Sequence, residues 1–128
     1  TFGHALEAET GFSDTLLHGE AVAAGMALAF RFSVAQGLCG EADAARVAAH
    51  LRAAGLPADA AEARVTADGA TLVGHMAHDK KMEGGRLPFL LAYAIGQTFL
   101  AKDVDLGTVA AFLDADRAGG AAMSTAAI

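Results

Sequence analysis

Two histidines near the start of the chain, His4 and His18, have side chains suited both to metal binding and to proton transfer. Neutral imidazole is a common zinc ligand, and it also accepts and donates protons near neutral pH. Between them lies GFSD at residues 11–14, a composition typical of a turn. Two helical segments that fold back at this turn would bring both imidazoles to one pocket. For each histidine the alternative is a structural role, as a helix cap or a hydrogen-bonded core residue.

Glu20 follows His18 by two residues, at the start of an otherwise apolar segment. Burial of a titratable ring in such a segment costs free energy unless a metal or a hydrogen bond satisfies it. Residues two positions apart on a helix point away from each other, so Glu20 cannot share the face of His18. We therefore predict that Glu20 supports the site or interacts with the helix dipole, and that it does not bind a metal directly.

The segments that must position these histidines have helical patterns. Apolar residues between 2 and 8 can form one stripe, which predicts a short first helix ending at the turn. Residues 17–36 are apolar on nearly every face and predict a long central helix, with Gly37 as its stop signal. Residues 41–54 repeat apolar side chains with the helical period, which predicts an amphipathic surface helix.

The next part of the chain predicts one more helix and a small ribbon. Thr66 with Asp68 can cap a helix that ends near His78, where a charged cluster begins. Residues 87–95 and 97–101 have the composition of two hairpin strands, and Pro88 favours an edge position because it lacks a backbone N–H.

The last part of the chain predicts a helix that begins at Asp105, followed by a frayed tail over residues 119–128. The chain has 128 residues, of which 54% are hydrophobic, and this suffices for one packed domain over residues 1–118. The predicted fold class is mainly α with a small β-ribbon.

The composition argues against several classes of protein. A net charge of −6 with nine Lys and Arg residues is unsuited to a nucleic-acid or anionic-membrane surface. No apolar run reaches the roughly 18 residues of a membrane span. The single cysteine, Cys39, cannot form an internal disulfide, and no charged-then-apolar leader begins the chain, so we expect a cytoplasmic location. The expected partner is a small molecule or another subunit.

A longer motif surrounds the two histidines. Residues 1–12 read TFGHALEAETGF, and residues 16–29 read LLHGEAVAAGMALA. This part of the chain resembles the 3-dehydroquinate synthases, in which a Gly-His-x-x-Gly-His segment precedes a His-Gly-Glu-x-Val-Ala-x-Gly-Met helix. Later segments look like further landmarks of that family in their usual order: AGLP at 54–57, HDKK at 78–81, GRL at 85–87 and AIG at 94–96. Pro88 is a mild departure, since the family often has a charged residue there.

The resemblance implies that the chain is the C-terminal helical, metal-binding domain of the dehydroquinate synthase-like fold, without the N-terminal NAD-binding domain. His18 matches a zinc ligand, and His4 matches a histidine that contacts substrate and relays protons. Lys80 and Lys81 match a segment in which a lysine binds an anionic group of the substrate, with Lys81 slightly favoured. Without the resemblance, both lysines would be read as a solvated charge cluster. The family's other two zinc ligands, a glutamate and a histidine, would both precede Thr1.

The implied reaction converts 3-deoxy-D-arabino-heptulosonate 7-phosphate to 3-dehydroquinate and phosphate, a step of the shikimate pathway of aromatic amino acid biosynthesis. NAD would oxidise a hydroxyl transiently, zinc, or alternatively cobalt, would act as the Lewis acid, and His4 would move the proton. The full-length enzyme is expected to be a homodimer, and this chain by itself is expected to be inactive.

Three alternatives stay open at this point. A related sugar-phosphate cyclase would close a different ring by the same steps, although the Asp79-Lys80-Lys81 segment favours the dehydroquinate branch. A metal-dependent polyol dehydrogenase would share the two-domain plan but usually lacks the His-Gly-Glu motif. A non-catalytic helical interaction domain would use both histidines structurally and the apolar helix as a subunit interface.

Overall fold

The computed structural model describes residues 1–11, 16–79 and 86–126, so Lys80 and Lys81 lie outside the described residues. Within these ranges the elements are α1 (Phe2–Glu9), α2 (His18–Ala35), α3 (Glu41–Ala53), α4 (Gly69–Asp79), β1 (Arg86–Ala94), β2 (Gln97–Asp105) and α5 (Leu106–Ala126). The two strands pair antiparallel in one sheet. The predicted class, mainly α with a small β-ribbon, is confirmed.

The helix boundaries follow from local chemistry. Helix α2 ends just before Gly37, whose φ of 74° lies in the left-handed region that glycine adopts without a steric cost. This confirms Gly37 as the stop signal. Helix α4 begins after Asp68, whose Oδ1 accepts hydrogen bonds from the backbone N and the Oγ1 of Thr71, at 2.9 and 2.7 Å. The predicted cap at Asp68 is therefore confirmed.

The ribbon is longer than the sequence predicts. Strand β2 continues to Asp105, whereas the apolar pattern indicates a partner strand that ends at residue 101. The charged residues beyond 101 are compatible with a strand because they are exposed on the two-stranded ribbon. The register shifts between Leu87 and Phe89, on either side of Pro88. A shift is expected there because proline has no N–H to donate to the ladder.

The C-terminal helix differs from the prediction at its far end. Asp105 caps the first turn of α5, since its Oδ2 accepts a hydrogen bond from the Thr108 backbone N at 3.1 Å. The helix then continues to Ala126, so the backbone is helical through most of the segment 119–128 that the sequence predicts to fray. The alanines in this segment favour a helix and offset its two glycines.

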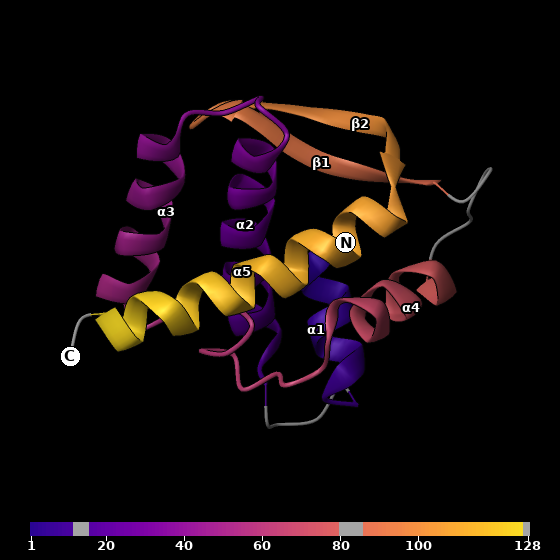
Figure 1. Cartoon of the computed structure of the whole chain (residues 1–128), viewed down its shortest axis with the longest axis horizontal. Helices are drawn as coiled ribbons and strands as arrows, with labels where there is room; N and C mark the ends of the chain where they lie inside the picture. The colour runs from indigo at the N-terminus through magenta and orange to yellow at the C-terminus, as the bar shows by residue number, and fades with distance from the viewer. Residues whose placement is uncertain (12–15, 80–85, 127–128) are drawn as a thin grey trace.

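Helix α2 is the centre of the domain. It packs against α1, α3 and β1, and more lightly against α5. Figure 1 shows α5 running along the long axis of the molecule, with the β-ribbon crossing one end of α2. Helix α4 packs on both α1 and α5, which places α1 between α2 and α4. Asp43 of α3 reaches the hairpin turn, where its Oδ2 accepts a hydrogen bond from the Ile95 backbone N at 3.1 Å.

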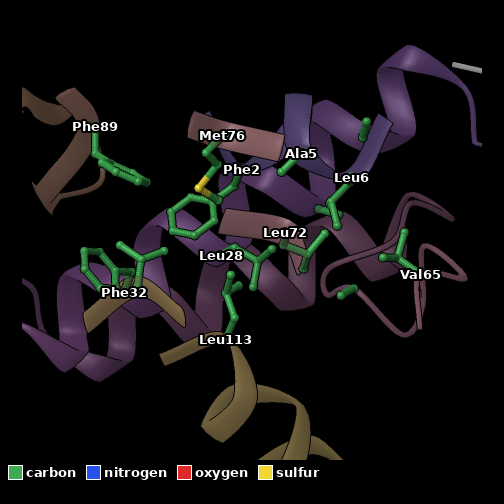
Figure 2. Close-up of a cluster of buried hydrophobic side chains, with 14 of the residues drawn as sticks. Phe2, Ala5, Leu6, Leu28, Phe32, Val65, Leu72, Met76, Phe89 and Leu113 are labelled. Carbon is green, nitrogen blue, oxygen red and sulfur yellow. The ribbon is translucent and has the colours of Figure 1, made fainter. Parts of the chain in front are cut away.

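Phenylalanine rings join these elements in the core. Phe2 of α1 lies 5.4 Å from Phe89 of β1 and 6.0 Å from Phe32 of α2, measured between ring centroids. Phe32 is fully buried, and its ring lies 5.1 Å from that of Phe112 in α5. Figure 2 shows Phe2 next to Met76 of α4, and Phe32 and Phe89 belong to the same buried cluster. Each of these phenylalanine rings comes from a different element, so their contacts hold α1 against the ribbon and α5.

Ser33 is the buried polar side chain of α2. Its hydroxyl donates to the Ala29 carbonyl oxygen at 2.7 Å and accepts a hydrogen bond from the Ala92 backbone N at 3.0 Å. Both hydrogen-bonding roles of the hydroxyl are therefore used, and β1 is fixed in register against α2.

Candidate functional site

Two glycines allow α1 and α2 to cross with their backbones in contact. A Cβ atom on Gly25 would lie 2.6 Å from the backbone nitrogen of Gly3 and 2.9 Å from its Cα. A Cβ on Gly3 would lie 3.1 Å from the carbonyl oxygen of Ala21. The close approach of the two helices therefore depends on the absence of side chains at both positions. His4 follows Gly3 directly, so the crossing places His4 beside α2.

His4 and His18 line the same pocket, which has a volume of about 320 Å³. The prediction that the fold brings both histidines to one pocket is confirmed. The other lining residues come from α1, α2 and β1: Thr1, Phe2, Gly3, Glu7, Val22, Gly25, Met26, Ala29, Phe89 and Leu90. The pocket therefore joins two imidazoles and one carboxylate to a mainly apolar wall, a combination typical of small-molecule sites.

His18 lies in the first turn of α2 and is exposed, with 72% of its side chain accessible to solvent. Its Nδ1 lies 3.0 Å from Oε1 of Glu7, whose side chain is only 12% exposed. The interpretation of His18 as a buried core residue is therefore wrong, because the start of α2 lies at the surface. A hydrogen-bonded imidazole facing solvent can still bind a metal ion or a substrate.

Glu20 closes the start of α2. Its Oε1 accepts a hydrogen bond from the Leu17 backbone N at 3.0 Å, as in a capping box. The prediction that Glu20 acts at the helix N-terminus, and not as a metal ligand, fits this geometry. The carboxylate also favours the positive end of the helix dipole.

Glu7 is the residue that sequence reasoning missed. It lies three residues after His4 on α1, and this spacing places both side chains on one face of the helix. The His-x-x-Glu spacing was therefore a usable signal. The pairing with His18 depends on the α1–α2 crossing, however, and no local pattern indicates that crossing.

The described residues contain part of a metal site at most. Among them, no three His, Cys, Asp or Glu side chains gather closely enough to hold an ion. His18 nevertheless fits the role of one ligand, because a hydrogen bond through Nδ1 leaves Nε2 of the neutral ring with its lone pair. His4 also lines this pocket, whereas Lys80 and Lys81 fall outside the described residues.

A larger hollow, of about 730 Å³, lies between α5 and the segment before α4, away from both histidines. Its arginines already have partners. The Arg52 Nε donates to Glu62 Oε2 at 2.8 Å, and the Arg117 guanidinium donates to the backbone carbonyls of Val65 and Thr66. We therefore assign the site to the smaller pocket, which two histidines and a glutamate line.

Comparison with known proteins decides the family. A family model described as the 3-dehydroquinate synthase C-terminal domain matches residues 1–82, which include His4, Glu7 and His18. The chain belongs to the 3-dehydroquinate synthase C-terminal family. The resemblance inferred from the two histidine motifs is thereby confirmed.

Relatives within the 3-dehydroquinate synthase family cover most of this chain. The 3-dehydroquinate synthase of Zymomonas mobilis is 64% identical over 114 residues, which are 89% of this chain and 30% of that relative. The enzyme of Caulobacter vibrioides is 54% identical over 116 residues, 88% of this chain and 31% of that relative. This chain therefore spans about a third of the length of these relatives.

A solved structure with the same fold is that of 2-deoxy-scyllo-inosose synthase complexed with carbaglucose-6-phosphate, NAD⁺ and Co²⁺. The TM-score is 0.66 at 19% identity, and the match covers 88% of this chain and 33% of that one. This chain therefore shares its fold with part of 2-deoxy-scyllo-inosose synthase. Among the described residues, no helix is both long and apolar enough to cross a membrane.

Proposed function

We propose that this chain forms the C-terminal part of a 3-dehydroquinate synthase, and that the longer protein converts 3-deoxy-D-arabino-heptulosonate 7-phosphate to 3-dehydroquinate and phosphate. The observation that carries the proposal is the pocket shared by His4 and His18, inside the region that the family model matches. The identity of 64% with a relative named 3-dehydroquinate synthase supports this substrate over another phosphate.

His18 fits one position in a divalent metal site, and zinc is the metal we propose. The Glu7 carboxylate beside Nδ1 favours the ring tautomer that presents Nε2 to an ion. When bound, the metal would supply Lewis acidity toward a substrate oxygen. The Co²⁺ in the structure of 2-deoxy-scyllo-inosose synthase makes cobalt the alternative.

His4 is proposed to accept and relay the substrate proton. It is exposed on α1 and lines the same pocket as His18, so a substrate seated there can lie within its reach. The apolar wall, with Val22, Met26 and Leu90, would limit water around the reacting atoms. Lys81, or Lys80, is proposed to hold an anionic group of the substrate.

The remaining parts of the site are assigned to residues that this chain does not span. We propose that NAD binds to an N-terminal domain corresponding to the larger part of the relatives. Oxidation and re-reduction of the substrate would take place between the two domains. The longer protein is proposed to be a homodimer, and its mass in solution by light scattering would test that state.

The proposal is tested with the longer protein, purified and supplied with NAD and zinc. Phosphate release and dehydroquinate formation are measured with 3-deoxy-D-arabino-heptulosonate 7-phosphate, and parallel assays offer a hexose phosphate or glycerol. We expect the longer protein to turn over the heptulosonate phosphate and neither of the other two substrates. The 128-residue chain by itself should turn over none of them. Ring closure of the hexose phosphate alone would instead identify another cyclase, and net NAD reduction by glycerol would identify a polyol dehydrogenase. No turnover of any substrate would favour a non-catalytic domain.

A further inference from the structure

The contact between Glu7 and His18 has a defined direction. A carboxylate only accepts hydrogen bonds, so at 3.0 Å from Oε1 the Nδ1 atom must carry the hydrogen. In the neutral ring the proton can occupy only one nitrogen, and Nε2 is then the atom with the lone pair. Glu7 therefore selects one of two tautomers of His18.

The exposure of the two side chains differs strongly. Glu7 is 12% exposed, whereas His18 is 72% exposed. The carboxylate is therefore largely shielded from solvent, and the exposed ring of its partner lines the same pocket. A group that binds Nε2 from the pocket would meet a ring that is already oriented.

A second carboxylate on α1 provides an internal comparison. Glu9 Oε2 lies 2.8 Å from Nε2 of His75 in α4, so this pair uses the other ring nitrogen. By the same reasoning, His75 carries its hydrogen on Nε2. Two glutamates of one helix thus hold two histidines in opposite tautomers, and His75 does not line the pocket.

We propose that Glu7 is a positioning residue, which fixes the tautomer and orientation of His18 so that Nε2 faces an incoming divalent metal ion. The proposal deepens the metal site of the proposed function and rests on it for the metal ion that His18 binds. The orienting effect on the ring belongs to this chain and requires no substrate, NAD or second domain.

The first test is the tautomer of His18 in the 128-residue chain, read from the ¹⁵N chemical shifts of its ring well above the pH at which histidine is protonated. We expect the Nδ1–H form in the unmodified chain and a shift toward the Nε2–H form in Glu7→Ala. Glu9→Ala is the matched control. It should change the ring ¹⁵N chemical shifts of His75 and leave those of His18 unchanged. Unchanged His75 signals in Glu7→Ala would show that this variant is folded.

The second test is metal affinity in the longer protein, measured by competition of Zn²⁺ and Co²⁺ with a chelating dye. Loss of an orienting partner typically weakens metal binding by about 10–100-fold, which is the effect expected for Glu7→Ala. Glu7→Gln should recover part of the affinity, since its amide oxygen can still accept the Nδ1 hydrogen. The proposal is overturned if His18 keeps the Nδ1–H form in Glu7→Ala, or if metal affinity is unchanged. Either result is independent of which substrate the enzyme uses.

Discussion

Gly25 of α2 lies against Gly3 of α1 so closely that a Cβ on Gly25 would stand 2.6 Å from the Gly3 nitrogen. Since backbone atoms cannot move aside as a flexible side chain can, a methyl group here must push α1 away from α2. We expect Gly25→Ala to lower the free energy of unfolding by about 1–3 kcal/mol, as for other overpacked sites. Urea denaturation followed by circular dichroism would measure this.

Gly74→Ala is the control for Gly25→Ala. Gly74 is exposed in α4, and a Cβ there would meet no atom within 4 Å. Alanine should therefore stabilise the helix by up to about 1 kcal/mol. Equal effects of the two substitutions would refute the steric account of the crossing.

Ser33 links α2 to the ribbon through the Ala92 amide, and Ser33→Ala removes that acceptor. A buried donor left without a partner costs about 1–3 kcal/mol, which is the expected loss of stability. Native-state hydrogen exchange should show faster exchange at the Ala92 amide in the variant. Lys102→Ala, at an exposed position of β2 that is not paired with Ala92, should leave that amide unchanged. Unaltered exchange at Ala92 in Ser33→Ala would contradict the assigned hydrogen bond.

The Asp68 carboxyl gives the domain a pH-dependent contribution to stability. The Thr71 hydroxyl, then the Thr71 backbone N–H, lower the pKa of Asp68 from its ordinary value of 3.8, and Arg117 adds a smaller lowering effect. Because the folded-state pKa lies below the unfolded one, this contribution is complete above the unfolded pKa and is lost as pH falls through the folded pKa. In Asp68→Asn, stability should therefore fall less steeply between about pH 4 and pH 2. Parallel stability curves for both proteins in that range would contradict the cap.

Arg31 and Asp116 join α2 to α5 through two hydrogen bonds, at 2.6 and 3.1 Å, and both side chains are largely buried. Asp116→Ala should cost about 1.5–3 kcal/mol, the range for hydrogen bonds to charged groups. The exposed pair of Arg52 and Glu62 is the comparison, and Arg52→Ala should cost less, about 1 kcal/mol or below, since solvent screens the pair. Arg52 is the residue changed because Glu62 Oε1 also accepts a hydrogen bond from the Ala58 backbone N. Thermal unfolding of both variants would measure this. A larger loss in Arg52→Ala would show that burial does not govern these pairs.

The sequence predicted those features that depend on neighbouring residues. Gly37 stops α2 and Asp68 caps α4 because both act within one helical turn. The hairpin was also predicted, but the end of β2 was not, because the charged residues after 101 carry no apolar alternation. The helical end of α5 was missed because a run of small residues has no periodic pattern to indicate burial.

Features that depend on tertiary contacts could not be predicted in the same way. The motif glycine Gly25 was visible, but its contact with Gly3 follows from how two helices cross. The pairing of Glu7 with His18 depends on that crossing, as does the pocket shared with His4. Residue types and spacing therefore indicated which groups do chemistry, and the crossing determined which of them meet.

His4 and His18 are proposed to act together in catalysis by the longer protein, and kcat/KM for the heptulosonate phosphate in three variants tests this most directly. We expect His4→Ala to lower kcat/KM by about 10²–10⁴-fold, as for loss of a general acid or base. His18→Ala should abolish turnover, and the purified variant should no longer bind one metal ion per chain. His50→Ala, at an exposed position of α3 outside the pocket, should match the unmodified enzyme. Full activity in both His4→Ala and His18→Ala would contradict the account, and would leave the pocket histidines with a structural role only.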